Sequence, residues 1–501
     1  MAPNLLRLAG QAVALNAVAN WIALLGSTLS TVVIARILSP DDYGVFVMAL
    51  IAISLPEVIA SGTLTDSIVQ RKQVRPGHVN SVFLQSMVLA IASWLLLILL
   101  APLIAEGFRN PDVVPVLVVC GAMLPIGAMM SVPSSLLQRE LRYKEITLVD
   151  VLGTVVASIT GVILALAWRN EWALVGMEMA RRLVRLVGFL FFARWVPGVA
   201  SNWQDFRELA RFNVTNGASK MLQTLDGMMP KTLIGATLGS SAVGLFNLPE
   251  RLFVQAYTAL IAPFAAVAMP VASAMQESRP SLHQAMENAI RTAAFLSYPT
   301  FVGGFVIAPY AIPMVFGEKW APSIPIFQVY MVIGLRAPIT AIISGVLRGV
   351  GRPDVVIWIT VGSLVSSVVF LLSAYQYGLT AIALALLGKQ VVTFSLSTWL
   401  VRRIVGLSIG RQFKAGATAF FASLIMGAIV WAFITFVPAG DKELLHLATA
   451  IVLGAVSYAL ALFGLSPRLG MQVVHAAGMV LRGHPGKAVQ LVRTALAQQN
   501  A

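Results

Sequence analysis

The sequence predicts an all-α polytopic membrane protein with about 14 transmembrane helices, in which two six-helix repeats surround a central cavity and two extra helices follow. Hydrophobic residues make up 58% of the 501 residues and charged residues only 11%, whereas roughly a quarter of an ordinary soluble domain is charged. The mean hydropathy is +0.83, and apolar runs of about 20 residues recur along the chain. These values exclude a soluble multidomain enzyme and an intrinsically disordered chain. The single cysteine, Cys120, lies in an apolar run and cannot form an internal disulfide.

Fourteen apolar segments are long enough for a helix to cross a ~30 Å hydrocarbon layer. The alternating period-two pattern of outer-membrane barrel strands does not occur in them. The first segment continues past the short apolar core of a cleaved signal peptide, so we expect it to remain as span one. The predicted spans, with boundaries uncertain by about four residues, are 13–36, 44–66, 80–106, 113–137, 147–168, 172–194, 212–236, 243–273, 290–316, 324–348, 354–375, 379–401, 414–437 and 445–465.

The loop charges predict the orientation of these spans. Cytoplasmic loops collect Lys and Arg because positive loops resist translocation. If the N-terminus is cytoplasmic, the inside segments hold 22 basic residues and the outside loops hold 5. We therefore expect both termini in the cytoplasm, and the net charge of +14 needs no nucleic-acid partner to explain it. The outside basic residues are Arg36, Arg109, Arg169, Lys319 and Lys442.

A shift of about 200 residues aligns the first half of the chain with the second. Asn16 then falls on Asn216 and Gly44 on Gly244, and a slightly larger shift places Arg194 on Arg402. We therefore expect two parallel six-helix halves, residues 1–195 and 196–410, related by a pseudo-two-fold axis along the membrane normal with a cavity between them.

The segments outside the spans have their own predictions. Residues 411–465 are two additional transmembrane helices, and 466–501 form a cytoplasmic basic amphipathic tail that is either an interfacial anchor or a docking site for a partner. Residues 195–211 and 276–289 have the pattern of short amphipathic surface helices.

Fourteen charged residues fall within the predicted spans. A lipid-facing charge near a helix centre costs roughly 2.5–3.5 kcal/mol, so these residues require either a wet cavity or mutual pairing. The basic ones are Arg181, Arg182, Arg185, Lys220, Lys231, Arg251, Arg336 and Lys389, and the acidic ones are Glu57, Asp66, Asp150, Glu178, Asp226 and Glu250.

Five of these cations are candidates for a substrate-binding cavity. A cationic cavity suits an anionic head group, and Arg in particular matches phosphate oxygens with two parallel hydrogen bonds. The candidates are Arg181, Arg185, Lys220, Arg336 and Lys389. Asn16, Asn20, Asn216 and Gln223 lie on polar stripes of spans one and seven and are predicted to line the same passage.

The acidic residues have two interpretations each. Glu57, deep in span two after Pro56, and Asp226 are candidates for proton or cation coupling. The alternative for Glu57 is a salt bridge with the opposite half. Glu178 can pair with Arg181 or Arg182 at helical spacing and so join helices without binding a ligand. Residues near span ends, such as Asp150, could reach the interface.

No catalytic or cofactor motif accompanies these charges. The sequence has no glycine-rich Walker loop with its Lys, and the five histidines have no metal-ligand spacing. No nucleophile, base and acid occur in a recognisable arrangement. We therefore expect a transporter that is not an enzyme and needs no cofactor.

Several short segments give the chain the look of a known family. They are residues 36–44 (Arg-Ile-Leu-Ser-Pro-Asp-Asp-Tyr-Gly), 68–72 (Ile-Val-Gln-Arg-Lys), 137–141 (Leu-Gln-Arg-Glu-Leu) and 316–320 (Phe-Gly-Glu-Lys-Trp) followed by Pro325 and the Arg336 region. In this order and spacing they resemble the Wzx-type polysaccharide transport proteins, especially the WzxC-like branch, of the multidrug/oligosaccharidyl-lipid/polysaccharide (MOP) exporter superfamily. The resemblance covers about residues 10–465.

The resemblance implies a flippase of the bacterial inner membrane. Such proteins move undecaprenyl-pyrophosphate-linked oligosaccharide repeat units to the periplasmic leaflet by alternating access, for exopolysaccharide or lipopolysaccharide biosynthesis. The implied partners are this lipid-linked substrate, the bilayer, and a polysaccharide polymerase and co-polymerase, and no nucleic acid is implied. The alternatives are a peptidoglycan-precursor (lipid II) flippase, a drug or cation antiporter of the same superfamily, and a membrane polymerase or ligase. The short outside loops argue against the last of these, since such enzymes carry a large periplasmic loop.

Overall fold

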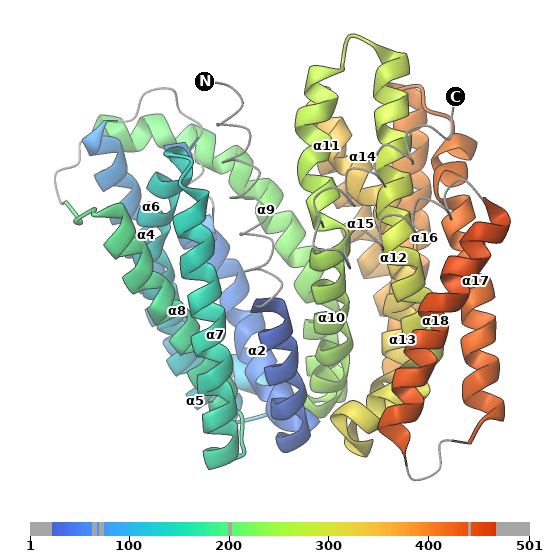
Figure 1. The fold of residues 1–501 in the computed structure, drawn as a ribbon. Coiled ribbons are helices and arrows are strands. Elements are labelled where there is room, and N and C mark those ends of the chain that lie inside the picture. Colours follow the sequence, from blue (N-terminus) through green and yellow to red (C-terminus); the bar gives the residue numbers. More distant parts are fainter. Residues whose placement is uncertain (1–22, 63–67, 70–74, 199–202, 439–441, 467–501) are drawn as a thin grey trace. The chain divides into compact units, whose positions relative to one another are not determined.

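The computed structural model describes residues 23–62, 68–69, 75–198, 203–438 and 442–466, and these residues are almost entirely helical (Figure 1). By its internal contacts the chain divides into two compact units, Met1–Asn247 and Leu248–Ala501. The division falls within the helix α10 (Ser240–Leu260). The predicted halves 1–195 and 196–410 were defined by the sequence repeat and stay a prediction.

Unit 1 begins, in its described part, with the apolar helix Ala23–Ile37. Its further elements are α2 (Pro40–Glu57), η1 (Val58–Gly62), α4 (Pro76–Phe108), α5 (Val113–Gly121), α6 (Met123–Arg139), α7 (Tyr143–Trp168), α8 (Trp172–Ala193) and α9 (Trp203–Leu238). Helix α2 starts at a capping box: the backbone N–H of Asp42 donates to Ser39 Oγ at 3.1 Å, and the N–H of Ser39 donates to Asp42 Oδ2 at 2.7 Å. Pro40 takes the first helical position, where a missing N–H is harmless.

The end of α2 departs from regular helix. Pro56 lies inside the last turn of α2, and the π-helical segment η1 follows directly after Glu57. Proline removes one intrahelical hydrogen bond, and a π turn inserts an extra residue into the helix; both locally re-aim side chains. Glu57 therefore lies at a built-in irregularity in the middle of a predicted span.

Helices α7 and α8 pack closely because small residues line their contact. Gly153, Ala157, Gly161 and Ala165 recur every four residues on the buried face of α7. A Cβ added at Gly153 would lie 2.9 Å from Cγ of Arg185 on α8. This spacing lets the backbones approach and brings the charged residues of α8 next to α7.

Unit 2 contains one very long helix and two bent helix pairs. The long helix is α12 (Arg279–Phe316), and the bent pairs are α10 with α11 (Ala262–Ala274), and η2 (Glu318–Ser323) and α13 (Ile324–Gly334) with α14 (Ala337–Gly349); each pair bends by 49°. The remaining elements are α15 (Pro353–Ala374), η3 (Tyr375–Tyr377), α16 (Leu379–Ile404), α17 (Ile409–Phe436) and α18 (Glu443–Leu465). The second bend places Arg336 directly before α14.

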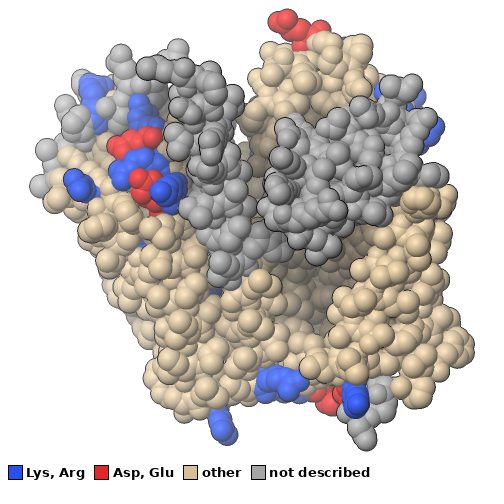
Figure 2. Space-filling model, in the orientation of Figure 1, with Lys and Arg blue, Asp and Glu red and all other residues tan. Residues whose placement is uncertain are grey.

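The helices confirm a multi-pass, all-α membrane architecture. Nine helices in the described part of the chain are long and apolar enough to cross a membrane, or up to eleven if each bent pair is one span. In Figure 2 the visible charged side chains of each unit gather towards its two ends, and uncharged residues fill the middle. Leu99 and Leu103 of α4 are 76% and 64% exposed, as expected of side chains that face lipid.

Three sequence predictions have a different outcome. The count of 14 stays a prediction, because α8 and α9 carry several charges and the beginning of span one lies outside the described residues. The tail 467–501 also lies outside them. The two short surface helices are wrong as separate elements in the described residues: residues 203–211 belong to α9 and residues 279–289 to α12, each of which continues without interruption.

Candidate functional site

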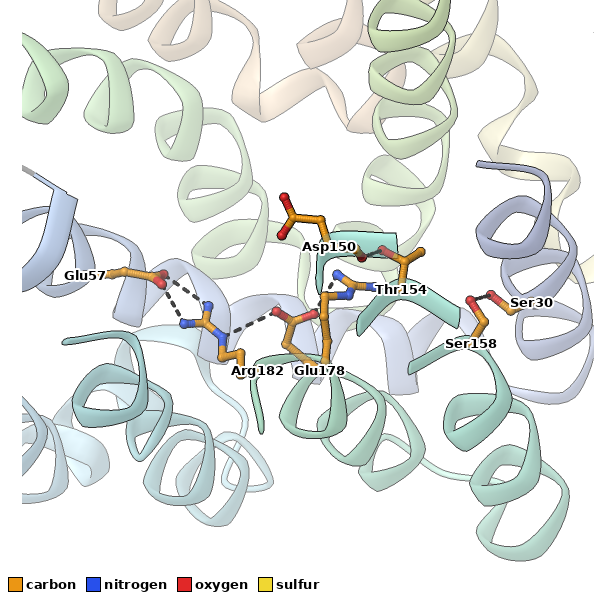
Figure 3. Close-up of polar contacts among 8 residues, drawn as sticks. Ser30, Glu57, Asp150, Thr154, Ser158, Glu178 and Arg182 are labelled. Atoms are coloured by element: carbon orange, nitrogen blue, oxygen red, sulfur yellow. Dashed lines mark hydrogen bonds and ion pairs between the residues drawn. The ribbon is translucent and has the colours of Figure 1, made fainter. Parts of the chain in front are cut away.

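The charged residues of unit 1 converge on one face of α8. Arg181 and Arg182 lie three and four residues after Glu178, and Arg185 lies four and three residues after them, so these side chains gather on one side of the helix. Two of their partners come from other helices. Glu57 lies at the end of α2, just before the π-helical segment, and Asp150 lies on α7, whose small residues let α8 approach closely. Figure 3 shows part of this cluster, with Arg182 between Glu57 and Glu178 and with Asp150 nearby.

Arg182 lies between two carboxylates. Its Nη1 donates to Glu57 Oε1 at 2.6 Å and its Nη2 to Glu57 Oε2 at 3.3 Å, which is the two-pronged geometry that makes Arg–carboxylate pairs strong. Its Nε also lies 3.4 Å from Glu178 Oε1. The Arg182 side chain is only 11% exposed and that of Glu57 is 35% exposed, so the arginine is largely removed from solvent and the carboxylate is half-buried.

The two neighbouring arginines are paired as well. Arg181 Nη1 donates to Glu178 Oε2 at 2.8 Å, and Arg185 Nε lies 2.9 Å from Asp150 Oδ1 of α7. Three arginines thus meet three carboxylates in unit 1. For Arg181 and Arg185 the pairing interpretation of the sequence is therefore realised in this conformation, and the cavity role stays a prediction.

Glu57 has a partner that sequence analysis missed. Its expected alternatives were an ion-coupling site or a salt bridge with the opposite half, but its carboxylate binds Arg182 of the same unit, 125 residues later in the chain. Arg182 itself was not among the predicted site residues. The sequence offers one pointer to Arg182, which is that it directly follows the candidate Arg181. This adjacency does not show which of the two arginines contacts α2.

Unit 2 presents a cation in a different setting. Arg336 is the residue before the first turn of α14, where the span bends. Its Nε is buried without a hydrogen-bond acceptor, and within the described residues no carboxylate pairs with it. Tyr257 lies near enough to interact electrostatically with both Arg336 and Arg348. Arg336 therefore combines a full positive charge with the partial positive charge of a helix N-terminus.

The other predicted residues are distributed over both units. Lys389 of α16 is only 5% exposed. Lys220 and Asp226 of α9 are half-buried, and Gln223 is exposed. Asn16, Asn20 and the side chain of Asn216 lie outside the described residues, so their lining role stays a prediction.

Comparison with known proteins identifies the family. The model of the family "Polysaccharide biosynthesis protein" matches residues 33–325, more than half of the chain. The chain belongs to this polysaccharide biosynthesis protein family. The match includes the capping box at Ser39, the Glu57–Arg182 pair and the Gly-Glu-Lys-Trp segment at 317–320.

Two relatives of this polysaccharide biosynthesis protein show the extent of the similarity. The lipopolysaccharide biosynthesis protein WzxC of Escherichia coli (strain K12) is 23% identical over 345 residues, which are 68% of this chain and 70% of WzxC. The succinoglycan biosynthesis transport protein ExoT of Rhizobium meliloti (strain 1021) is 24% identical over 327 residues, or 65% of this chain and 66% of ExoT. The predicted resemblance to Wzx-type proteins is confirmed.

Among solved structures, the lipid II flippase MurJ in an inward closed conformation has a similar fold. The TM-score is 0.75 at 14% identity, and the alignment covers 90% of this chain and 98% of MurJ. At this identity the likeness concerns the fold alone. It confirms the predicted all-α, multi-pass fold.

Proposed function

We propose that this family member is a flippase that moves undecaprenyl-pyrophosphate-linked oligosaccharide units across the bacterial inner membrane, with both termini in the cytoplasm. The observation that carries the proposal is Arg336, a cation at a helix break within the apolar part of unit 2 that has no carboxylate partner in the described residues. The names of the relatives, which are a lipopolysaccharide biosynthesis protein and a succinoglycan transport protein, support the polysaccharide part.

An unneutralised Arg in a membrane span suits a mobile anionic ligand. Retaining the charge without a partner costs free energy, so such residues mark binding sites or pathways. A pyrophosphate supplies at least two negative charges and several acceptor oxygens, and each charge-assisted hydrogen bond contributes roughly 1.5–3 kcal/mol. The polyprenyl tail would stay in lipid, and the sugars would lie along polar residues such as Gln223.

The ion pairs of unit 1 would act during the transport cycle and would not set the affinity for the pyrophosphate in the conformation described here. Glu57 is the ion-coupling candidate, and release of Arg182 from its two carboxylates, Glu57 and Glu178, would make this arginine available to the pyrophosphate. In the same proposal Arg181, Arg185, Lys220 and Lys389 contribute to the cationic surface in other states of the cycle, and Asp226 is a second coupling candidate. The protein carries out no covalent chemistry, and a polymerase with its co-polymerase would use the units at the periplasmic leaflet.

Deletion in the source bacterium tests the function. Loss of one polysaccharide, with lipid-linked units retained on the cytoplasmic leaflet, is the expected result. If the units still reach the periplasm while polymer is lost, the protein acts at polymerisation and the flippase proposal is wrong.

A lipid II flippase is a second candidate because the fold resembles that of MurJ over 90% of the chain. Expression in cells depleted of their own lipid II flippase distinguishes the two: restored growth would favour lipid II as substrate. A drug antiporter would instead change resistance to cationic drugs without changing polysaccharide export.

A further inference from the structure

We propose that one end of unit 2 carries a binding surface for the head groups of anionic phospholipids, separate from the transport pathway. The surface, here called the basic rim, consists of exposed cations at the ends of α12, α16 and α17. Its residues are Arg279, Arg402, Arg403, Arg411 and Lys414.

The loop between α16 and α17 joins these helix ends. A Cβ added at Gly406 would lie 3.7 Å from a guanidinium nitrogen of Arg279 and 3.8 Å from the ring of His283, both on α12. Nε2 of His283 lies 2.9 Å from the carbonyl oxygen of Val405. The N–H of Gly406 donates to the carbonyl of Arg402 at 3.1 Å. Gly406 has a φ of +88°, a left-handed conformation that suits glycine. The backbone of the loop between α16 and α17 therefore favours glycine at this position.

Within the described residues, the rim has too few carboxylates to neutralise it. Glu287 of α12 binds Arg411, with 2.5 Å between Oε1 and Nε, but Glu287 is buried while the Arg411 side chain is 53% exposed. Glu277, which is exposed, precedes α12. These two carboxylates face five exposed cations, and Arg291, half-buried beside Glu287, adds a further positive charge.

Two helices also begin here with cations instead of acids. The first turns of α12 and α17 contain no acidic residue, and Arg279 and Arg411 occupy them. The N-terminal end of a helix carries partial positive charge and ordinarily favours acidic side chains. Arg279 and Arg411 therefore add positive charge to helix ends that are already positive. This arrangement is unfavourable without a bound anion and favourable with one.

Aromatic side chains beside the rim indicate that its ligand is a lipid. Trp399 is 45% exposed and Phe413 is 50% exposed, and the guanidinium carbon of Arg403 lies 5.5 Å from the centre of the Trp399 ring. Exposed Trp next to Lys and Arg is typical of the membrane–water interface. Basic pockets between transmembrane helices bind phospholipid head groups by the same chemistry. A free phosphate would use the cations but gain nothing from the apolar neighbours.

Brominated lipids can test the rim through Trp399. The protein is reconstituted in phosphatidylcholine vesicles that contain 20 mol% of either brominated phosphatidylglycerol or brominated phosphatidylcholine, and the quenching of Trp399 is obtained by subtracting the signal of Trp399→Phe. We expect brominated phosphatidylglycerol to be enriched at Trp399 by at least about fivefold, the ratio that corresponds to about 1 kcal/mol, the contribution of a single Lys or Arg near the surface. In Arg279→Gln/Arg402→Gln/Arg403→Gln/Lys414→Gln the two lipids should quench equally.

Controls separate the rim from general charge effects. Arg352→Gln changes an exposed arginine that Asp354 already pairs, so the enrichment should be retained. The double variant Arg402→Gln/Arg403→Gln, which leaves the α12 contacts intact, should lose part of the enrichment if the fourfold variant fails to fold. Equal quenching by both lipids in the wild type would overturn the proposal. Displacement of the brominated lipid by millimolar inorganic phosphate would do the same and assign the rim to soluble anions. Neither result depends on whether the protein flips oligosaccharide lipids.

Discussion

Three arginines of unit 1 and Arg336 of unit 2 carry positive charge in opposite settings. In unit 1, Arg181, Arg182 and Arg185 each have a carboxylate within 3 Å, and these carboxylates come from α2, α7 and α8 itself. In unit 2, Arg336 lies at a helix break with no such partner in the described residues. A paired charge holds helices together at little net gain, whereas an unpaired one can be retained only if something else benefits from it. Under the proposed function, the ion pairs of unit 1 would serve structure and switching, and Arg336 of unit 2 would bind the anion.

The largest expected effect is on the stability of unit 1. Arg182→Ala removes the arginine from Glu57, whose side chain is 35% exposed, and breaking a partly buried ion pair from one side costs up to about 3 kcal/mol. Unfolding of unit 1 can be followed with a thiol-reactive dye, because Cys120, the single cysteine, is fully buried in α5. Replacing both partners, in Arg182→Met/Glu57→Met, should recover most of the loss.

The double variant also tests the proposed switch. A stable Arg182→Met/Glu57→Met protein that transports normally would show that the pair only joins α2 and α8. A stable protein that no longer transports would support the coupling role of Glu57. If the single variant Arg182→Ala unfolds at the wild-type temperature, the pair does not stabilise unit 1, and the structural role assigned to it is wrong.

The second expected effect is on ligand affinity in unit 2. Arg336→Ala should raise the Kd for farnesyl diphosphate, a short polyprenyl diphosphate, by roughly 10- to 150-fold, the range that corresponds to one lost charge-assisted hydrogen bond. Arg336→Lys keeps the charge but loses the planar fork, so its Kd should be intermediate. Binding is measured in detergent with farnesol as the uncharged comparison ligand.

Arg352→Ala is the matched control for this measurement. Arg352 is also an arginine just before a helix, α15, but it is exposed and its guanidinium contacts Asp354 at 2.9 Å. Its Kd should equal that of the wild type. An unchanged Kd for a well-folded Arg336→Ala protein would remove Arg336 from the binding site and leave Lys389 and Lys220 as the candidates.

Sequence analysis could predict the fold but only part of the site. The apolar spans, the loop charges and the segment at Ser39 depend on local composition, and they suffice for the membrane architecture and the family. The Glu57–Arg182 pair depends on the packing of α2 against α8 across 125 residues, and no local pattern encodes it. Arg336 has no carboxylate partner within the described residues, and only a three-dimensional structure can show such an absence. Sequence analysis did not predict that the two surface segments are parts of α9 and α12. A polar end of a long helix and a separate short polar helix have the same local pattern.

The third expected effect concerns the contact that positions α8. Gly153→Ala should destabilise unit 1 by about 1–2 kcal/mol, since the new Cβ would lie 2.9 Å from Cγ of Arg185 and 3.4 Å from the carbonyl oxygen of Arg181. Gly26→Ala is the control, because no atom lies within 4 Å of its added Cβ and alanine favours helix over glycine. The Cys120 assay should show a lower unfolding temperature for the first variant and an equal or higher one for the second. Equal stability of Gly153→Ala and the wild type would mean that close α7–α8 packing does not hold the charge network in place.

The smallest expected effect is a pH dependence at the opposite end of unit 1 from the α6–α7 connection. Glu171 precedes α8, outside the apolar segments, and its pKa is raised by partial burial and by the nearby charges of Asp42, Asp112 and Asp41. A raised pKa in the folded state means that the folded protein binds the proton more readily than the unfolded chain. Stability contributed in this way is present at pH values below the ordinary Glu pKa and is lost as the pH rises through the raised one.

Glu171→Gln removes this titration. The variant should therefore match the wild type at pH 4 and be slightly more stable at pH 7, by less than about 1 kcal/mol because the group is partly exposed and screened by solvent. Thermal unfolding monitored at Cys120 at both pH values measures the difference. Asp354→Asn is the matched control: Asp354 pairs with Arg352 at 2.9 Å, so this variant should lose stability at neutral pH instead of gaining it. Because Asp354 lies in unit 2, which lacks Cys120, the unfolding of the Asp354→Asn variant is followed by tryptophan fluorescence. A Glu171→Gln protein that is less stable than the wild type at pH 7 would mean that the favourable interaction of a carboxylate with the N-terminus of α8 outweighs the repulsion from the three aspartates.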